Sequence, residues 1–305
     1  MTVLGYGRSS MADLVCWNFT ELPVEVIDIL ERDIKKRLEI DNISKILVHA
    51  DNILAQYDPK VDYPESQTYR RNQTRLNCHR HEQIFHEHNV IPEFCFGCFK
   101  VQIEPRTVVE LIKLFLLFDW IALEADNSRK CIVELRDNVP GFYKALIFCS
   151  SLDEAKLIQN TISTYVSELI DLNVSCLIKR GCSEFSISYP RYGRVENDTT
   201  DGLMVYPDEW ESIENDYDER YQSDRSPFGS PTLKGFSLSD FLIIKNWIGY
   251  ATGIGDTSVD TLSIKQIGSN RLLKAAAKRR SKLMITTQSV AIKNSGYNIK
   301  PINIS

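Results

Sequence analysis

The sequence predicts an α+β fold whose centre is a ferredoxin-like split β-α-β-β-α-β domain, with helical N-terminal and C-terminal additions. Four segments alternate apolar and polar residues with the period of two that is typical of strands. A segment with helical periodicity follows the first of them, and another follows the third. This order along the chain is that of the split βαβ unit. The four strands are expected at residues 96–103, 130–136, 142–149 and 174–189.

Local signals mark where these elements begin and end. Pro105 stands where the first helix would start, and a buried stripe begins at Val108. Ser151 and Glu154 have the spacing of a capping box, which predicts the start of the second helix. The fourth strand is expected to end or bend at Gly181, because glycine weakens a strand.

Changes in composition divide the chain into four parts. Residues 1–93 form an N-terminal helical region with a Cys/His-rich stretch, and residues 94–190 form the α+β domain. Residues 191–235 are interpreted as an acidic, mobile excursion, because eleven Asp and Glu residues lie between positions 196 and 225. Residues 236–305 contain a C-terminal helix and a basic tail.

Composition and charge exclude several classes of protein. The first twenty residues lack the basic start and apolar run of a secretory signal. The longest apolar segment, residues 108–125, is interrupted by charged residues, so no membrane span is expected. The net charge of −5 gives no overall tendency to bind nucleic acid. We expect a soluble, cytoplasmic protein with reduced thiols.

Residues 78–100 hold three of the eight cysteines and four of the five histidines. In the predicted sheet, the start of strand 1 and the end of strand 4 lie at one edge, which brings Cys95 and Cys98 beside Cys182. Tetrahedral zinc takes thiolate and imidazole ligands, and a C-x-x-C pair supplies two of them from one turn. The expected ligands are Cys95, Cys98 and Cys182, with the fourth from Cys78 or from one of the histidines, His86 among them. An iron–sulfur centre is the second choice of cofactor.

A purely structural interpretation of the same stretch stays open. Free cysteine is among the most buried residue types, so Cys95 and Cys98 could simply be core residues. The histidines could lie on a solvated helix that buries Ile84 and Phe85. With strand order 4-1-3-2 and strands 1 and 3 parallel, the remaining cysteines of the domain are expected in the core at the opposite edge: Cys131, Cys149 and Cys176.

Helices cover one face of such a sheet, which leaves charged side chains on the other face. This predicts an anion-binding platform with an acid/base group inside it. The expected substrate-binding residues are Lys100, Arg136, Lys179 and Arg180, and those expected to act in proton transfer are Glu134, Glu184 and Lys144. The alternative is a solvated face on which Glu134 and Lys144 form a cross-strand pair.

Three functions are compatible with these features. The first is an enzyme that acts on an anionic substrate carrying phosphate, with or without a metal. The second is a nucleic-acid-binding protein that uses the basic tail and a loop containing Arg70, Arg71 and Arg75. The third is a regulatory or assembly module. The expected partner is an anionic small molecule or nucleic acid, and no oligomeric state is predicted.

Overall fold

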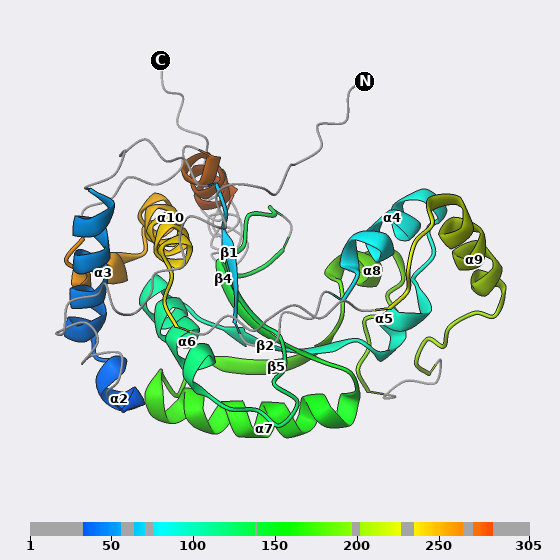
Figure 1. Ribbon diagram of the computed structural model, residues 1–305, viewed down its shortest axis with the longest axis horizontal. Coiled ribbons are helices and arrows are strands. Elements are labelled where there is room, and N and C mark those ends of the chain that lie inside the picture. The colour runs from blue at the N-terminus through cyan, green and yellow to red at the C-terminus, as the bar shows by residue number, and fades with distance from the viewer. Residues whose placement is uncertain are drawn as a thin grey trace, which may run out of the picture.

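The computed structural model describes residues 33–55, 64–70, 76–137, 139–196, 202–226, 235–264 and 271–282. These residues form an α+β structure around one five-stranded antiparallel sheet (Figure 1). The helix expected between residues 22 and 38 lies mostly outside them, as do Arg71 and Arg75. Two N-terminal helices are present, the short α2 (Ile34–Arg37) and the longer α3 (Ile40–Leu54).

The sheet has the strand order β1-β3-β4-β2-β5, and each neighbouring pair is antiparallel. Four of its strands are the four that the sequence predicts, in the predicted order 4-1-3-2, and the fifth lies at the edge beside β3. The strands are β1 (Gln67–Arg70), β2 (Phe99–Glu104), β3 (Arg129–Val133), β4 (Tyr143–Cys149) and β5 (Ser175–Arg180).

One predicted orientation is wrong. The first and third strands of the predicted unit, β2 and β4, were expected to be parallel, but Phe99 pairs with Cys149 and Ile103 with Ala145, which is antiparallel. Each helical crossover joins two strands that run in the same direction. One joins β2 to β3, with the oppositely directed β4 between them, and the other joins β4 to β5, with the oppositely directed β2 between them. Cys149 therefore lies at the same end of the sheet as Cys98, and not at the opposite edge. The ferredoxin-like assignment itself stays a prediction.

Three long helices pack against one face of the sheet, and a fourth packs on the last of these three (Figure 1). In α6 (Val108–Trp120), the Thr107 side chain caps the first turn. In α7 (Leu152–Leu169), Ser151 accepts a hydrogen bond from the Glu154 N–H, as the capping pattern predicts. The third is α10 (Leu238–Ile254), which starts at a complete capping box, and the fourth is α3. The predicted basic helix is also present, at residues 271–282.

The main core lies between these helices and the sheet. Alternate strand residues point into it, among them Val101 and Ile103 on β2 and Ala145 and Ile147 on β4, all fully buried. The sequence predicted this face correctly from the period-two pattern. A short 3₁₀ helix, η3 (Thr257–Thr261), closes the end of α10.

A second group of helices lies at the far end of the sheet (Figure 1). We call α4 (Cys78–His88), α5 (Glu93–Gly97), α8 (Ser183–Ser188) and α9 (Glu209–Tyr221) the helical lobe. The alternative expectation for α4 is confirmed, because it is an amphipathic helix that buries Ile84 and Phe85. The fourth predicted strand, residues 174–189, ends at Arg180, next to Gly181 where the sequence predicted an end or a bend, and the helix α8 follows.

The interpretation of residues 191–235 as a mobile excursion is wrong for α9, which is a packed helix. Arg80 on α4 donates to Glu214 at 2.8 Å and to Asp218 at 2.6 Å, and both Arg80 and Glu214 are buried. The acidic residues therefore have a cationic partner that the composition of the segment alone could not reveal. In the part of the chain that the structure describes, every helix is too short or too polar to cross a lipid bilayer.

Candidate functional site

The sequence predicted that the sheet face opposite the main core is an open charged surface, but the polar side chains on this face are buried. The exposed fractions of Lys100, Gln102, Glu134 and Lys144 are 8%, 4%, 2% and 5%. These polar side chains are buried, and each has a hydrogen-bonding partner within the protein. The prediction failed because strand periodicity identifies the face on which a side chain lies but not what packs over that face.

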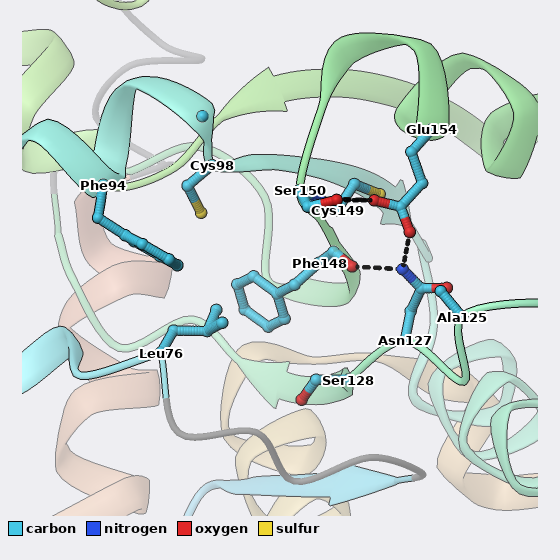
Figure 2. Close-up of a pocket in the computed structure, with 11 residues that line it drawn as sticks. Leu76, Phe94, Cys98, Ala125, Asn127, Ser128, Phe148, Cys149, Ser150 and Glu154 are labelled. Carbon is cyan, nitrogen blue, oxygen red and sulfur yellow. Dashed lines mark hydrogen bonds between the residues drawn. The ribbon is translucent and has the colours of Figure 1, made fainter. Parts of the chain in front are cut away.

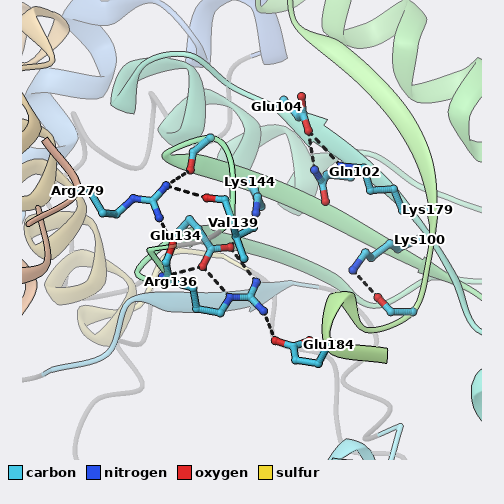
Figure 3. A network of polar contacts seen from close by, with 12 residues as sticks. Lys100, Gln102, Glu104, Glu134, Arg136, Val139, Lys144, Lys179, Glu184 and Arg279 are labelled. Atoms are coloured by element: carbon cyan, nitrogen blue, oxygen red, sulfur yellow. Dashed lines mark hydrogen bonds and ion pairs between the residues drawn. The ribbon is translucent and has the colours of Figure 1, made fainter. Parts of the chain in front are cut away.

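Four of the predicted residues form a continuous series of ion pairs, which we call the ion chain: Lys144, Glu134, Arg136 and Glu184 (Figure 3). Lys144 Nζ lies 2.7 Å from Glu134 Oε2. Arg136 donates to Glu134 through Nε and a terminal nitrogen, each at 2.8 Å, and it also pairs with Glu184. Arg279, from the helix at 271–282, donates to three backbone carbonyls of the β3–β4 loop beside it.

The electrostatics of the ion chain are those of a satisfied structural network. Burial alone would raise the pKa of Glu134, but hydrogen bonds from Arg136 and Lys144 outweigh it and lower this pKa to about 2. Burial lowers the pKa of Lys144, against the opposing effect of Glu134. The cross-strand pair of Glu134 with Lys144, which was the alternative to a catalytic role, is present in the structure.

The other predicted substrate-binding residues are not brought together. Lys179 is 41% exposed and pairs with Glu104 at 3.4 Å. Arg180 lies directly opposite Phe99 in the β2–β5 ladder, and its guanidinium lies 4.6 Å from the centroid of that ring. Directly paired residues share a face and adjacent residues alternate, so Arg180 and Lys100 approach this end of the sheet from opposite faces.

The cysteines give a different result, because the predicted proximity of Cys182 to the C-x-x-C turn is confirmed. Cys95 lies in α5 and Cys98 is its C-cap residue, so the two share one turn. The Gly181 N–H donates to the Cys98 carbonyl at 3.0 Å, and Cys182 packs against the apolar cluster that contains Cys95. A side chain at position 181 would lie 2.9 Å from the Tyr192 hydroxyl, so glycine permits this close approach.

We call Cys78, Cys95, Cys98 and Cys182 the thiol cluster. Burial is the main cause that raises the pKa of each thiol, to about 11 for Cys98 and about 12 for Cys182. Cys78 is a further cause, because a negative charge on its sulfur would raise the pKa of each of the other three thiols. Within the described residues, no three Cys, His, Asp or Glu side chains already stand in positions that could hold a metal ion.

Two buried cations face the thiol cluster. The Lys100 ammonium donates to the Gly181 carbonyl, and the Arg180 guanidinium donates to the carbonyls of Phe96 and Arg194. Burial lowers the pKa of Lys100, and negative charge on Cys182 or Cys98 would raise it. Among the residues that the structure describes, no carboxylate lies within ion-pair distance of either cation.

His86, an alternative to Cys78 as the fourth ligand, does not join the thiol cluster. It is exposed on α4, and at 1.5 Å per residue the eight residues from Cys78 place it about 12 Å further along the helix. Cys131 and Cys176 are also apart from it, because Cys131 pairs with Ala145 within the sheet and Cys176 lies at the start of β5.

A cavity of about 370 Å³ adjoins the thiol cluster through Cys98 (Figure 2). The rings of Phe94 and Phe148 line one side, and Asn127 and Glu154 lie on the other. Sequence reasoning missed this cavity, because its walls come from α5, β4, α7 and the loop before β3. Glu154 was the one residue in the sequence that could have indicated the cavity, but it was interpreted only as part of a helix cap.

Some of the arginines and lysines proposed for nucleic-acid binding have protein partners, whereas Arg271, Lys274 and Arg280 of the basic helix are exposed. Arg70 is buried and lies 2.5 Å from Asp240. Lys278 and Lys282, in the basic helix, both pair with Asp137. Arg71, Arg75 and the rest of the tail lie outside the described residues.

Comparisons with protein-family models, with curated proteins and with solved structures gave no match to this chain.

Proposed function

We propose that the thiol cluster binds one zinc ion, which joins the helical lobe to the sheet. The observation that carries this proposal is a pair of buried cations, Lys100 and Arg180, beside four reduced thiols, with no carboxylate partner among the described residues. The thiols come from three separate segments, at the start of α4, at the α5–β2 turn and at the β5–α8 turn. A bound ion would therefore cross-link parts of the chain that are distant in sequence.

Charge balance supports a thiolate site. Four thiolates and one divalent ion leave a net charge of about −2, and the buried charges of Lys100 and Arg180 would offset it. An unpaired buried cation is costly, and so is a buried thiolate. A buried cation and a buried thiolate that lie side by side therefore reduce each other's cost of burial. Without an ion the thiols stay protonated, which agrees with the raised pKa values of Cys98 and Cys182.

The backbone positions support the proposal as well. Cys98 caps α5, Cys182 caps α8 and Cys78 begins α4, so each stands at the end of an element. Rotation about the Cα–Cβ bond moves a cysteine sulfur without moving the backbone. Zinc requires the sulfurs to converge to about 2.3 Å from the ion. Such a site requires reduced thiols, which supports the expectation of a cytoplasmic location.

The test is elemental analysis of the purified full-length chain, combined with cysteine variants. We expect about one zinc per chain. Cys182→Ser should lose it, whereas Cys176→Ser, a matched change at the other end of β5, should keep it. Because Cys182→Ser could also disturb folding, Co²⁺ is added to the wild-type chain as a second measurement. Tetrahedral thiolate coordination should produce strong sulfur-to-cobalt absorption. Absence of both zinc and this absorption would overturn the proposal, and iron with visible absorption would indicate a cluster instead.

We also propose that β2 to β5 with α6 and α7 constitute a ferredoxin-like unit to which β1 has been added at one edge. The strand order and the two crossovers support this assignment. The alternative functions, an enzyme on an anionic substrate and a nucleic-acid-binding protein, both require cations that are free to bind. Arg70, Lys100, Arg136, Lys144, Lys179 and Arg180 are already paired or buried, whereas Arg271, Lys274 and Arg280 of the basic helix stay exposed, which leaves the nucleic-acid alternative to be tested by the salt dependence of binding.

A further inference from the structure

We infer that the cavity beside Cys98 is a binding site for a small molecule with a flat apolar ring and a neutral or cationic hydrogen-bond donor, and that it excludes phosphate. This inference goes beyond the proposed zinc site, because it depends on side chains that are not zinc ligands. Its volume of about 370 Å³ is within the range of small-molecule sites in proteins.

One side of the cavity is apolar and suited to a ring. Phe94 and Phe148 direct their rings toward the same space, with Leu76 beside them (Figure 2). Phe94 is 40% exposed, an unusual position for so large an apolar group, and a ligand would cover it. The ring of Phe94 is already held in place, because it stacks on His81 with the centroids 5.3 Å apart. Such preorganisation lowers the entropy cost of binding.

The other side of the cavity carries a held carboxylate. Glu154 accepts from Asn127 Nδ2 at 2.7 Å, and from the Ser150 N–H and hydroxyl at 2.6 and 2.7 Å. Burial would raise the pKa of Glu154, but the hydrogen bonds from Ser150 and Asn127 outweigh it and lower this pKa. The carboxylate is therefore ionised at neutral pH. It can accept about four hydrogen bonds, so room remains for one from a ligand.

Charge decides which head group the cavity accepts. Of the described residues that line it, Glu154 alone has a formal charge at neutral pH, and no lysine or arginine is among them. An anion such as phosphate would meet only repulsion there, whereas an amide, amine or amidinium could donate to the carboxylate. Cys98 also lines the cavity, where its sulfur adds a soft, polarisable contact.

The experiment uses three probes that share one ring and differ in head group: benzamidine, benzamide and benzoate. Binding to the full-length chain is followed by ligand-observed NMR and by calorimetry. We expect benzamidine to bind most tightly, benzamide more weakly and benzoate at least about tenfold more weakly than benzamidine. Equal binding of benzoate and benzamidine, or no binding of any probe, would overturn the inference.

Two variants locate the site. Phe94→Ala should weaken benzamidine binding at least about fivefold, and its matched control, Tyr221→Ala, removes an exposed ring from α9 and should change nothing. Glu154→Gln should abolish the preference for benzamidine over benzoate. Because Glu154 also supports the start of α7, the unfolding temperature of that variant is measured alongside, and Phe94→Ala keeps the test decisive if Glu154→Gln fails to fold. Zinc content is measured on the same samples, so a failure of this inference is distinguished from a failure of the zinc proposal.

Discussion

Two clusters of buried charge lie at this sheet, and they differ in how their cations are compensated. In the ion chain, Lys144 meets the carboxylate of Glu134, and Arg136 bridges two carboxylates. At the thiol cluster, the described partners of Lys100 and Arg180 are backbone carbonyls, aromatic rings and thiols, and Glu184 acts on Lys100 only from beyond ion-pair distance. Among the described residues, the cations of the first cluster contact carboxylates, whereas those of the second have no anion in direct contact.

This difference shows that burial of a lysine does not by itself indicate a role. Lys100 and Lys144 lie on adjacent strands, are almost equally buried and were both predicted to lie on the same anion-binding face. The partner separates them, because a buried cation beside a carboxylate stabilises the fold, while one beside thiols favours their deprotonation. The following predictions test that distinction.

The largest effect is expected from breaking the completed cluster. Glu134→Gln would leave Lys144 buried without its carboxylate, which should cost about 3–5 kcal/mol of unfolding free energy. The control is Glu104→Gln, which breaks the exposed pair with Lys179 and should cost less than about 1 kcal/mol. Urea denaturation measures both. Equal losses in the two variants would show that the ion chain is not a buried structural network.

Acid should weaken the same cluster in a defined range of pH. The pKa of Glu134 is lowered in the folded state, so its contribution to stability is present above its ordinary value of 4.5 and is lost as the pH falls toward about 2. Other carboxylates also titrate there, so the useful quantity is the difference in unfolding free energy between wild type and Glu134→Gln. This difference should shrink between about pH 5 and pH 2. A constant difference across that range would contradict the assigned pKa shift.

The smallest effect, and the sharpest distinction, is expected from Lys100→Met. Removing this cation should weaken zinc binding about tenfold, because the thiolates lose a compensating charge. It should also leave the zinc-free protein as stable as before or more stable, because an uncompensated buried charge is removed.

Lys144→Met is the matched control for this variant. It should lower stability in both states without changing zinc affinity, because Lys144 pairs with Glu134. Competition with a chromogenic zinc chelator measures affinity, and thermal unfolding with and without zinc measures stability. If the two variants change zinc affinity equally, the two clusters do not differ as we describe.

The fold was predictable to the extent that its signals are local. The alternation in residues 130–133 and 143–149 predicted β3 and β4, and the spacing of Ser151 and Glu154 predicted the start of α7. Strand β1 was not predicted, because four residues in a polar segment carry no periodicity. The strand forms because residues far along the chain bind its polar side chains. Thr68 donates a hydrogen bond to Asp240 at 2.8 Å, and Arg70 forms an ion pair with the same carboxylate.

The candidate site was predictable only in part. The C-x-x-C spacing and the strand order placed Cys95 and Cys98 beside Cys182, and contacts at Gly181 confirm this. The cavity and the roles of Lys100 and Arg180 were missed, because each depends on which side chains of other elements face it.

The sequence by itself determined which residues form strands and helices and which strand face is apolar, because periods of 2 and 3.6 residues and capping groups act over a few neighbouring positions. Only the tertiary structure decided which charges are paired and which are left to compensate another group. A lysine on a strand has the same sequence signature whether it meets a carboxylate, as Lys144 does, or a row of thiols, as Lys100 does. The difference arises from strand pairing, which brings together residues that lie far apart in the chain.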